Sequence, residues 1–137
     1  MSKGLNDADN TLPVPTEDVE QMRIMQWARM RSGRYPELKL LFHIPNGGSR
    51  GKVEAARLKE MGVKPGVPDL FLPVPKGGYC GLFIELKRRR GGQVSSEQKE
   101  WIAALLNAGY CASVCRGFDA AADLISKYVA GEVKRWG

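Results

Sequence analysis

Two short apolar segments, joined by a connection rich in proline and glycine, predict a β-hairpin in the middle of the chain. The segments are residues 69–72 and 82–88, and the connection is residues 73–81. If the two strands pair in antiparallel fashion, Asp69 at the start of the first lies near the end of the second.

The second strand carries two charged side chains where the chain is most apolar. With the period of two that a strand imposes, Glu85 and Lys87 share one face, and Leu82, Ile84 and Leu86 share the other. Lysine and glutamate are rarely buried unless they are paired or bound to something. This face is therefore where we expect the chemistry.

Helical periodicity and capping signals predict helices on both sides of the hairpin. The first helix spans residues 16–31 and is capped by Thr16, and the second spans residues 52–61. The third spans residues 95–109 and opens with a capping box of Ser95 and Gln98, and the last is capped by Asp119. Two further short apolar runs, residues 40–44 and 110–115, predict buried strands. The order suits an α/β fold with a small mixed sheet flanked by helices.

The length of 137 residues suits a single domain, which we place at residues 16–131. Residues 1–15 read as a flexible leader and residues 132–137 as a frayed tail. No apolar run approaches the roughly 20 residues needed to cross a bilayer, and no signal peptide is evident. The expectation is a cytoplasmic protein without a membrane partner, in a bacterial host cell if a phage encodes it. The 3 cysteines form no Cys-x-x-Cys pair, so neither a disulfide framework nor a zinc clip is indicated.

The net charge of +6 favours a polyanionic partner, although charge alone could equally describe a solvated basic surface. The basic residues gather directly after Lys87 and in the segment before Asp69. His43 and Asn46, at the end of the predicted strand 40–44, could project toward the same site or toward bound nucleic acid. The candidate nucleic-acid-binding residues are His43, Asn46, Arg50, Lys52, Arg88, Arg89 and Arg90.

Carboxylates that meet in a partly desolvated pocket repel one another, and a divalent cation resolves that conflict. Asp69 and Glu85 form such a pair, and Glu20, on the inward stripe of the first helix, is a possible third acid. Hard oxygen ligands without a His or Cys cluster favour Mg²⁺ or Mn²⁺ over zinc. An alternative for Glu20 is an ion pair with Arg23, and Gln98, which could also point inward, can simply complete its cap.

These motifs resemble the virus-type replication-repair nuclease (VRR-NUC) domain of the PD-(D/E)xK nuclease superfamily, over roughly residues 17–115. The carriers of the resemblance are Glu20, His43-Ile44-Pro45-Asn46-Gly47, Gly66-Val67-Pro68-Asp69-Leu70, Ile84-Glu85-Leu86-Lys87 and Ser95-x-x-Gln98. The resemblance implies a restriction-endonuclease-like αβββαβ core and hydrolysis of phosphodiester bonds in DNA. It also implies a homodimer and a branched, Holliday-junction-like substrate in phage or bacterial replication, repair or recombination.

The resemblance assigns roles residue by residue. Asp69, Glu85 and the backbone carbonyl of Leu86 would bind the metal, Lys87 would be catalytic, and Glu20, possibly through water, and Gln98 would complete the site. One alternative is a non-cleaving nucleic-acid-binding module, although acids near phosphates would weaken such binding. A second is an ordinary ion pair between Glu85 and Lys87, which leaves Asp69 and Glu20 unexplained.

Overall fold

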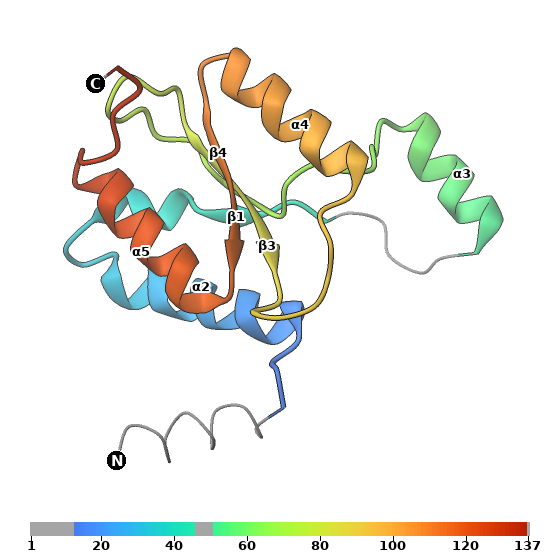
Figure 1. Ribbon diagram of the computed structural model, residues 1–137, viewed down its shortest axis with the longest axis horizontal. Coiled ribbons are helices and arrows are strands. Elements are labelled where there is room, and N and C mark those ends of the chain that lie inside the picture. The colour runs from blue at the N-terminus through green and yellow to red at the C-terminus, as the bar shows by residue number, and fades with distance from the viewer. Residues whose placement is uncertain (1–12, 46–50, 137) are drawn as a thin grey trace.

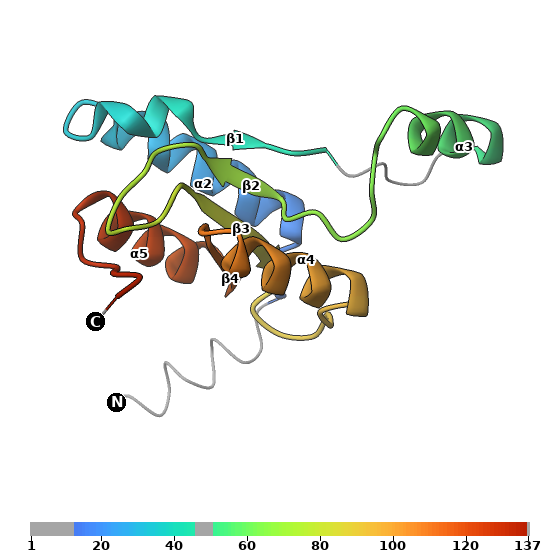
Figure 2. The same cartoon turned by 90° about the horizontal axis from the view of Figure 1, so that it is seen from above.

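The computed structural model describes residues 13–45 and 51–136 of the chain. Within them, four strands form a sheet in the order β1-β2-β3-β4. Figure 1 shows the sheet with its helices, and Figure 2 labels all four strands. The strands are β1 (Phe42–His43), β2 (Leu70–Leu72), β3 (Leu82–Lys87) and β4 (Cys111–Arg116). The first three pair in antiparallel fashion and β3 pairs with β4 in parallel. The predicted small mixed sheet and its central hairpin are confirmed.

Helices cover both faces of the sheet. Helices α2 (Glu17–Arg31) and α5 (Phe118–Val129) pack together on one face, and α4 (Ser96–Asn107) packs against β4 from the other, as Figure 2 shows. The apolar face of β3 forms the core with the buried side chains of Ile24 on α2 and of Ile125 and Tyr128 on α5. None of the helices in the described ranges is long and apolar enough to cross a membrane.

The predicted caps of α2 and α4 are present. The Thr16 hydroxyl accepts a hydrogen bond from the Val19 N–H at 3.2 Å, and α2 buries Glu20 on its inward stripe. At α4 the Ser95 hydroxyl accepts from the Gln98 N–H at 3.1 Å, and the Gln98 side-chain oxygen accepts from the Ser95 N–H at 2.8 Å. These contacts are local in sequence, which explains why the sequence reveals them.

Two predicted elements differ in the structure. Residues 36–40 form the 3-10 helix η1 (Pro36–Leu40), which proline at its first position favours, so the predicted strand 40–44 is reduced to β1. Helix α5 begins at Phe118 after an N-cap at Gly117, so Asp119 is not its cap and lies in its first turn. The Phe118 N–H is capped instead by the Glu20 carboxylate from α2, a contact between distant segments.

The C-terminal tail is held to the body along residues 132–136, in contrast to the predicted frayed tail. The Arg135 N–H donates to the Gly77 carbonyl in the hairpin connection at 2.9 Å. Val133 packs against the core, and its carbonyl approaches Gly77 so closely that a side chain there would overlap it. The tail therefore supports the turn between β2 and β3.

Helix α3 (Lys52–Glu60) projects from the body as an arm, which Figures 1 and 2 show from two directions. None of its residues is buried, and Val53 and the adjoining Met61 are 86% and 70% exposed. A short helix without tertiary packing is marginal in water. The arm therefore needs an additional source of stability.

Two glycines in the segment before Asp69 test how closely α4 packs against that segment. Gly62 and Gly66 both have positive φ, at 105° and 91°, but only Gly66 has a neighbour: an added Cβ would lie 2.6 Å from the Glu97 carbonyl carbon. We expect Gly62→Ala to cost about 1–2 kcal/mol of unfolding free energy from backbone strain. Gly66→Ala should lower the free energy of unfolding clearly more than Gly62→Ala does, because α4 must also move to make room for the added Cβ. Equal losses in urea unfolding would contradict this packing.

Candidate active site

Asp69 lies where the pairing between β2 and β3 ends. Extending the register of Leu70 with Ile84 by two places sets Pro68 opposite Leu86, and proline has no N–H to offer a ladder. The Leu86 N–H donates instead to Oδ2 of Asp69, at 2.7 Å. The carboxylate of Asp69 thus accepts the Leu86 N–H at the place where the strand pairing ends, and the missing N–H of Pro68 leaves the Leu86 carbonyl without a ladder donor from that residue.

The backbone of Asp69 is fixed from β1. Its carbonyl accepts hydrogen bonds from the Ile44 N–H at 2.7 Å and from Nδ1 of His43 at 2.8 Å. Because a carbonyl can only accept, this contact requires the proton of His43 on Nδ1. His43, predicted to bind nucleic acid, is exposed and in this structure helps to position Asp69.

Glu85 is only 2% exposed, and its side chain shares a hydrogen bond with the Asp69 carboxyl. Burial, this hydrogen bond and the negative charges of Asp69 and Glu17 raise the pKa of Glu85 to about 9, against a smaller lowering by Lys87. Within the described residues, Oε1 of Glu85 is buried without any hydrogen-bond partner. A buried acceptor in this condition is costly unless a further ligand satisfies it.

Lys87 is 7% exposed and belongs to the same face of β3 as Glu85. Its carbonyl accepts from the Gly117 N–H at 2.9 Å, which fixes the end of the strand against β4. In the part of the chain that the structure describes, no carboxylate lies within 4.0 Å of its ammonium. An ordinary ion pair between Glu85 and Lys87 is therefore not what the structure shows.

The structure does not bring Glu20 to the acid pair. Glu20 is 0% exposed, and its carboxylate accepts from the Phe118 N–H and lies 3.5 Å from the guanidinium groups of both Arg23 and Arg89. The positive end of helix α5 and the two guanidinium groups attract this carboxylate, whereas the acid pair would repel it. The predicted pairing with Arg23 is present, whereas the role of Glu20 at a metal stays a prediction.

A different acid of α2, which the sequence reasoning missed, acts on the site. The negative charge of Glu17 makes a small contribution to the raised pKa of Glu85, after burial and Asp69. Figure 1 shows this end of α2 beside the end of β3, and Arg88 donates to the Val14 carbonyl at 3.4 Å. The only sequence signal was an acid directly after the Thr16 cap, which the helix dipole alone would explain.

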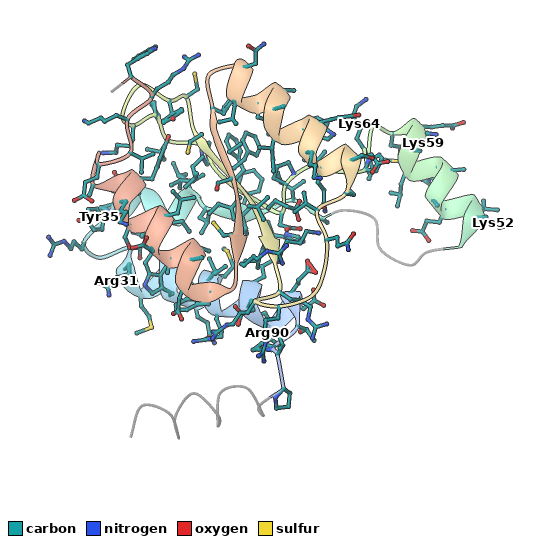
Figure 3. The ribbon with its side chains drawn as sticks, viewed as in Figure 1. Arg31, Tyr35, Lys52, Lys59, Lys64 and Arg90 are labelled. Carbon is teal, nitrogen blue, oxygen red and sulfur yellow. The ribbon has the colours of Figure 1, made fainter. Side chains whose placement is uncertain are left out.

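The remaining predicted residues lie in separate places. Gln98 uses its side-chain oxygen in the cap of α4, and its role in catalysis stays a prediction. Lys52 lies on the arm, and Arg88, Arg89 and Arg90 are exposed after β3; Figure 3 shows Lys52 and Arg90 well apart. Asn46 and Arg50 lie outside the described residues.

The residues present suit a hard divalent cation. Among residues 13–45 and 51–136, no three His, Cys, Asp or Glu side chains form a metal-binding group, so Glu20, the possible third acid, does not join Asp69 and Glu85 there. Asp69 and Glu85 nevertheless offer two adjacent carboxyls beside the backbone of Leu86, with one buried oxygen unsatisfied. This oxygen set suits a hard divalent cation.

Comparison with known proteins shows the family of this chain. The model of the VRR-NUC domain family matches residues 15–119. The chain belongs to the VRR-NUC domain family. It is also similar to a solved structure described as a "VRR_NUC domain protein", with 35% sequence identity, a TM-score of 0.75, and coverage of 88% of this chain and 93% of that one. A search of curated proteins finds no match. The family is one of nucleases, which supports a nuclease-like role.

The raised pKa of Glu85 predicts how stability depends on pH without metal. Between the ordinary value of 4.5 and the folded value of about 9, the folded state holds a proton that the unfolded state has lost, so stability falls as pH rises. The free energy of unfolding should fall by up to about 1.4 kcal/mol for each pH unit in this range. Glu85→Gln, which carries no titrating group, should lose less stability over this range than the wild type.

The measurement is urea unfolding in EDTA at pH 5, 7 and 9. The control is Glu60→Gln, at an exposed glutamate on α3, which should follow the wild type. If the difference between wild type and Glu85→Gln stays constant across these pH values, the Glu85 pKa is not raised.

Proposed function

We propose that this VRR-NUC domain is a metal-dependent endonuclease that hydrolyses phosphodiester bonds in DNA. The observation that carries the proposal is the pair formed by the buried Glu85 and the partly buried Asp69, with a Glu85 oxygen that is unsatisfied among the described residues and the Lys87 ammonium on the same face. A protein that only bound DNA would gain affinity by losing these acids. The proposed cofactor is Mg²⁺ or Mn²⁺.

Each residue of the set has a distinct task in this proposal. Asp69, Glu85 and the carbonyl of Leu86 would hold the cation, which would offset charge on the phosphate and acidify the attacking water. The Leu86 N–H and the His43 ring keep Asp69 in place. Lys87, which has no carboxylate within 4.0 Å among the described residues, would orient the water or stabilise the charge that develops on the phosphate.

The cleavage test uses supercoiled and branched DNA with Mg²⁺, with Mn²⁺ and with EDTA. Asp69→Asn keeps an acceptor for the Leu86 N–H but removes a charge, and Lys87→Ala removes the ammonium, so each should lower the rate by about 100-fold or more. DNA binding should be largely intact. Cleavage in EDTA, or full activity of Asp69→Asn, would overturn the mechanism, and binding without any cleavage would favour a non-cleaving module.

Matched controls are available on α5. Asp123 and Lys127 form an exposed ion pair at 3.0 Å, away from the acid pair. Asp123→Asn and Lys127→Ala remove the same kinds of charge as the site variants, and surface pairs contribute little. Both variants should cleave at the wild-type rate.

The proposed assembly is a homodimer acting on branched DNA, and the α3 arm supports it. A groove of about 460 Å³ lies at the base of the arm, lined by apolar residues that include Ile44, Val63 and Trp101. The exposed apolar side chains of the arm, such as Val53 and Met61, and an apolar groove on the same chain allow two copies to exchange arms around a twofold axis. Two sites held in this way would suit a substrate with two strands to cut.

The dimer is tested by Val53→Glu on the arm. A buried, unpaired charge in the interface should dissociate the dimer, so that light scattering gives 15.1 kDa in place of twice that mass. The control is Met30→Glu on α2, at a methionine that is as exposed as Val53 but lies outside the arm and its groove. A wild-type monomer, or a dimer unaffected by Val53→Glu, would contradict this assembly.

A further inference from the structure

The turn that follows Lys87 is held by a residue of the neighbouring strand. Arg116, the last residue of β4, is paired in register with Lys87. Its Nη1 donates to the carbonyls of Arg88 at 3.3 Å and Gly91 at 2.9 Å, and its Nη2 donates to the carbonyl of Gly92 at 3.4 Å. One side chain therefore fixes the whole turn of residues 88–92.

The backbone of this turn suits the contact. Gly91 and Gly92 have φ values of 73° and 61°, two consecutive residues in the left-handed region that other residues rarely adopt. This conformation brings the carbonyls of Arg88, Gly91 and Gly92 within reach of one guanidinium group. An added Cβ at either glycine would meet nothing within 4 Å, so the glycines serve the backbone conformation and not close packing.

A guanidinium group is suited to this task and an ammonium group is not. Arginine presents five N–H donors in a planar fork, which can reach carbonyls that are spread along a turn, whereas lysine presents one compact charge. With its donors on three carbonyls, Arg116 acts on the protein backbone. The residues that it holds in place, Arg88, Arg89 and Arg90, are the exposed basic group next to Lys87.

The backbone is held from β4 at a second point. The Gly117 N–H donates to the Lys87 carbonyl at 2.9 Å. Arg116 and Gly117, at the end of β4, therefore bind the carbonyls of Arg88 and Lys87, at the end of β3. Arg89 is also tied to α2, through its 3.5 Å contact with Glu20. The position of the basic turn relative to Lys87 is thus set by β4.

We propose that Arg116 is a positioning residue for the DNA backbone: it holds the turn 88–92 so that its arginines meet phosphates at a fixed distance from Lys87. This inference rests on the proposed function. Arg116 itself touches neither the phosphate nor the reacting atoms.

The test is Arg116→Lys, which keeps the charge but cannot span the three carbonyls. Duplex DNA binding without divalent cations should weaken by about fivefold, the loss expected from broken hydrogen bonds. The dependence of binding on salt should keep its slope, because the number of charges is unchanged. In cleavage assays KM should rise and kcat should change less than KM.

Arg31→Lys is the matched control, at an exposed arginine that Figure 3 shows on the opposite side of the body from the α3 arm and away from Arg90. It should bind DNA as the wild type does. Amide hydrogen exchange of residues 88–93 adds a readout that needs no DNA, and Arg116→Lys should speed this exchange while the rest of β3 and β4 stays protected.

The outcomes separate the two proposals. If the wild type does not bind DNA, the proposed function fails. Faster amide exchange of the turn in Arg116→Lys would in that case still show that Arg116 fixes residues 88–92. If Arg116→Lys binds DNA with wild-type affinity, or if exchange of the turn is unchanged, the positioning role is overturned. If the thermal midpoint falls and the whole sheet exchanges faster, Arg116 supports the fold in general and the proposal is equally overturned.

Discussion

The hydrogen bond from the Leu86 N–H to the Asp69 carboxylate is the contact on which the site depends. It forms where the pairing between β2 and β3 ends, so that a side-chain carboxylate and not a strand carbonyl accepts the Leu86 N–H. This carboxylate is thereby held against Glu85, a second acid in a buried position. Ionising both of these neighbouring acids is costly, so they share a proton, which a bound cation would replace.

Two glutamates with almost the same burial have different surroundings. Glu20 is surrounded by a helix N-terminus and two arginines, which satisfy its charge within the protein. Glu85 has an acid neighbour and an oxygen without a partner in the described structure. Burial alone therefore does not distinguish a structural acid from a candidate metal ligand, and the groups around the acid do.

The sequence predicts those features that depend on neighbours along the chain. The two faces of β3, the Thr16 cap and the capping box of Ser95 and Gln98 all follow from spacing, and all are present. The contact between Glu20 and Phe118, the clamp formed by Arg116 and the influence of Glu17 join residues far apart in the chain. Composition and periodicity carry no signal for such contacts. The acid pair was predicted because a hairpin register links Asp69 to Glu85, whereas no register links α2 to α5.

The central claim is that a divalent cation replaces the proton shared by Asp69 and Glu85. Calorimetric titration of Mn²⁺ into the protein at pH 7.5, repeated in buffers of different ionisation enthalpy, counts the protons released. With the pKa of Glu85 at about 9, the account predicts the release of about one proton per bound ion, and close to none from Glu85→Gln. Binding of Mn²⁺ by the wild type without proton release would contradict it.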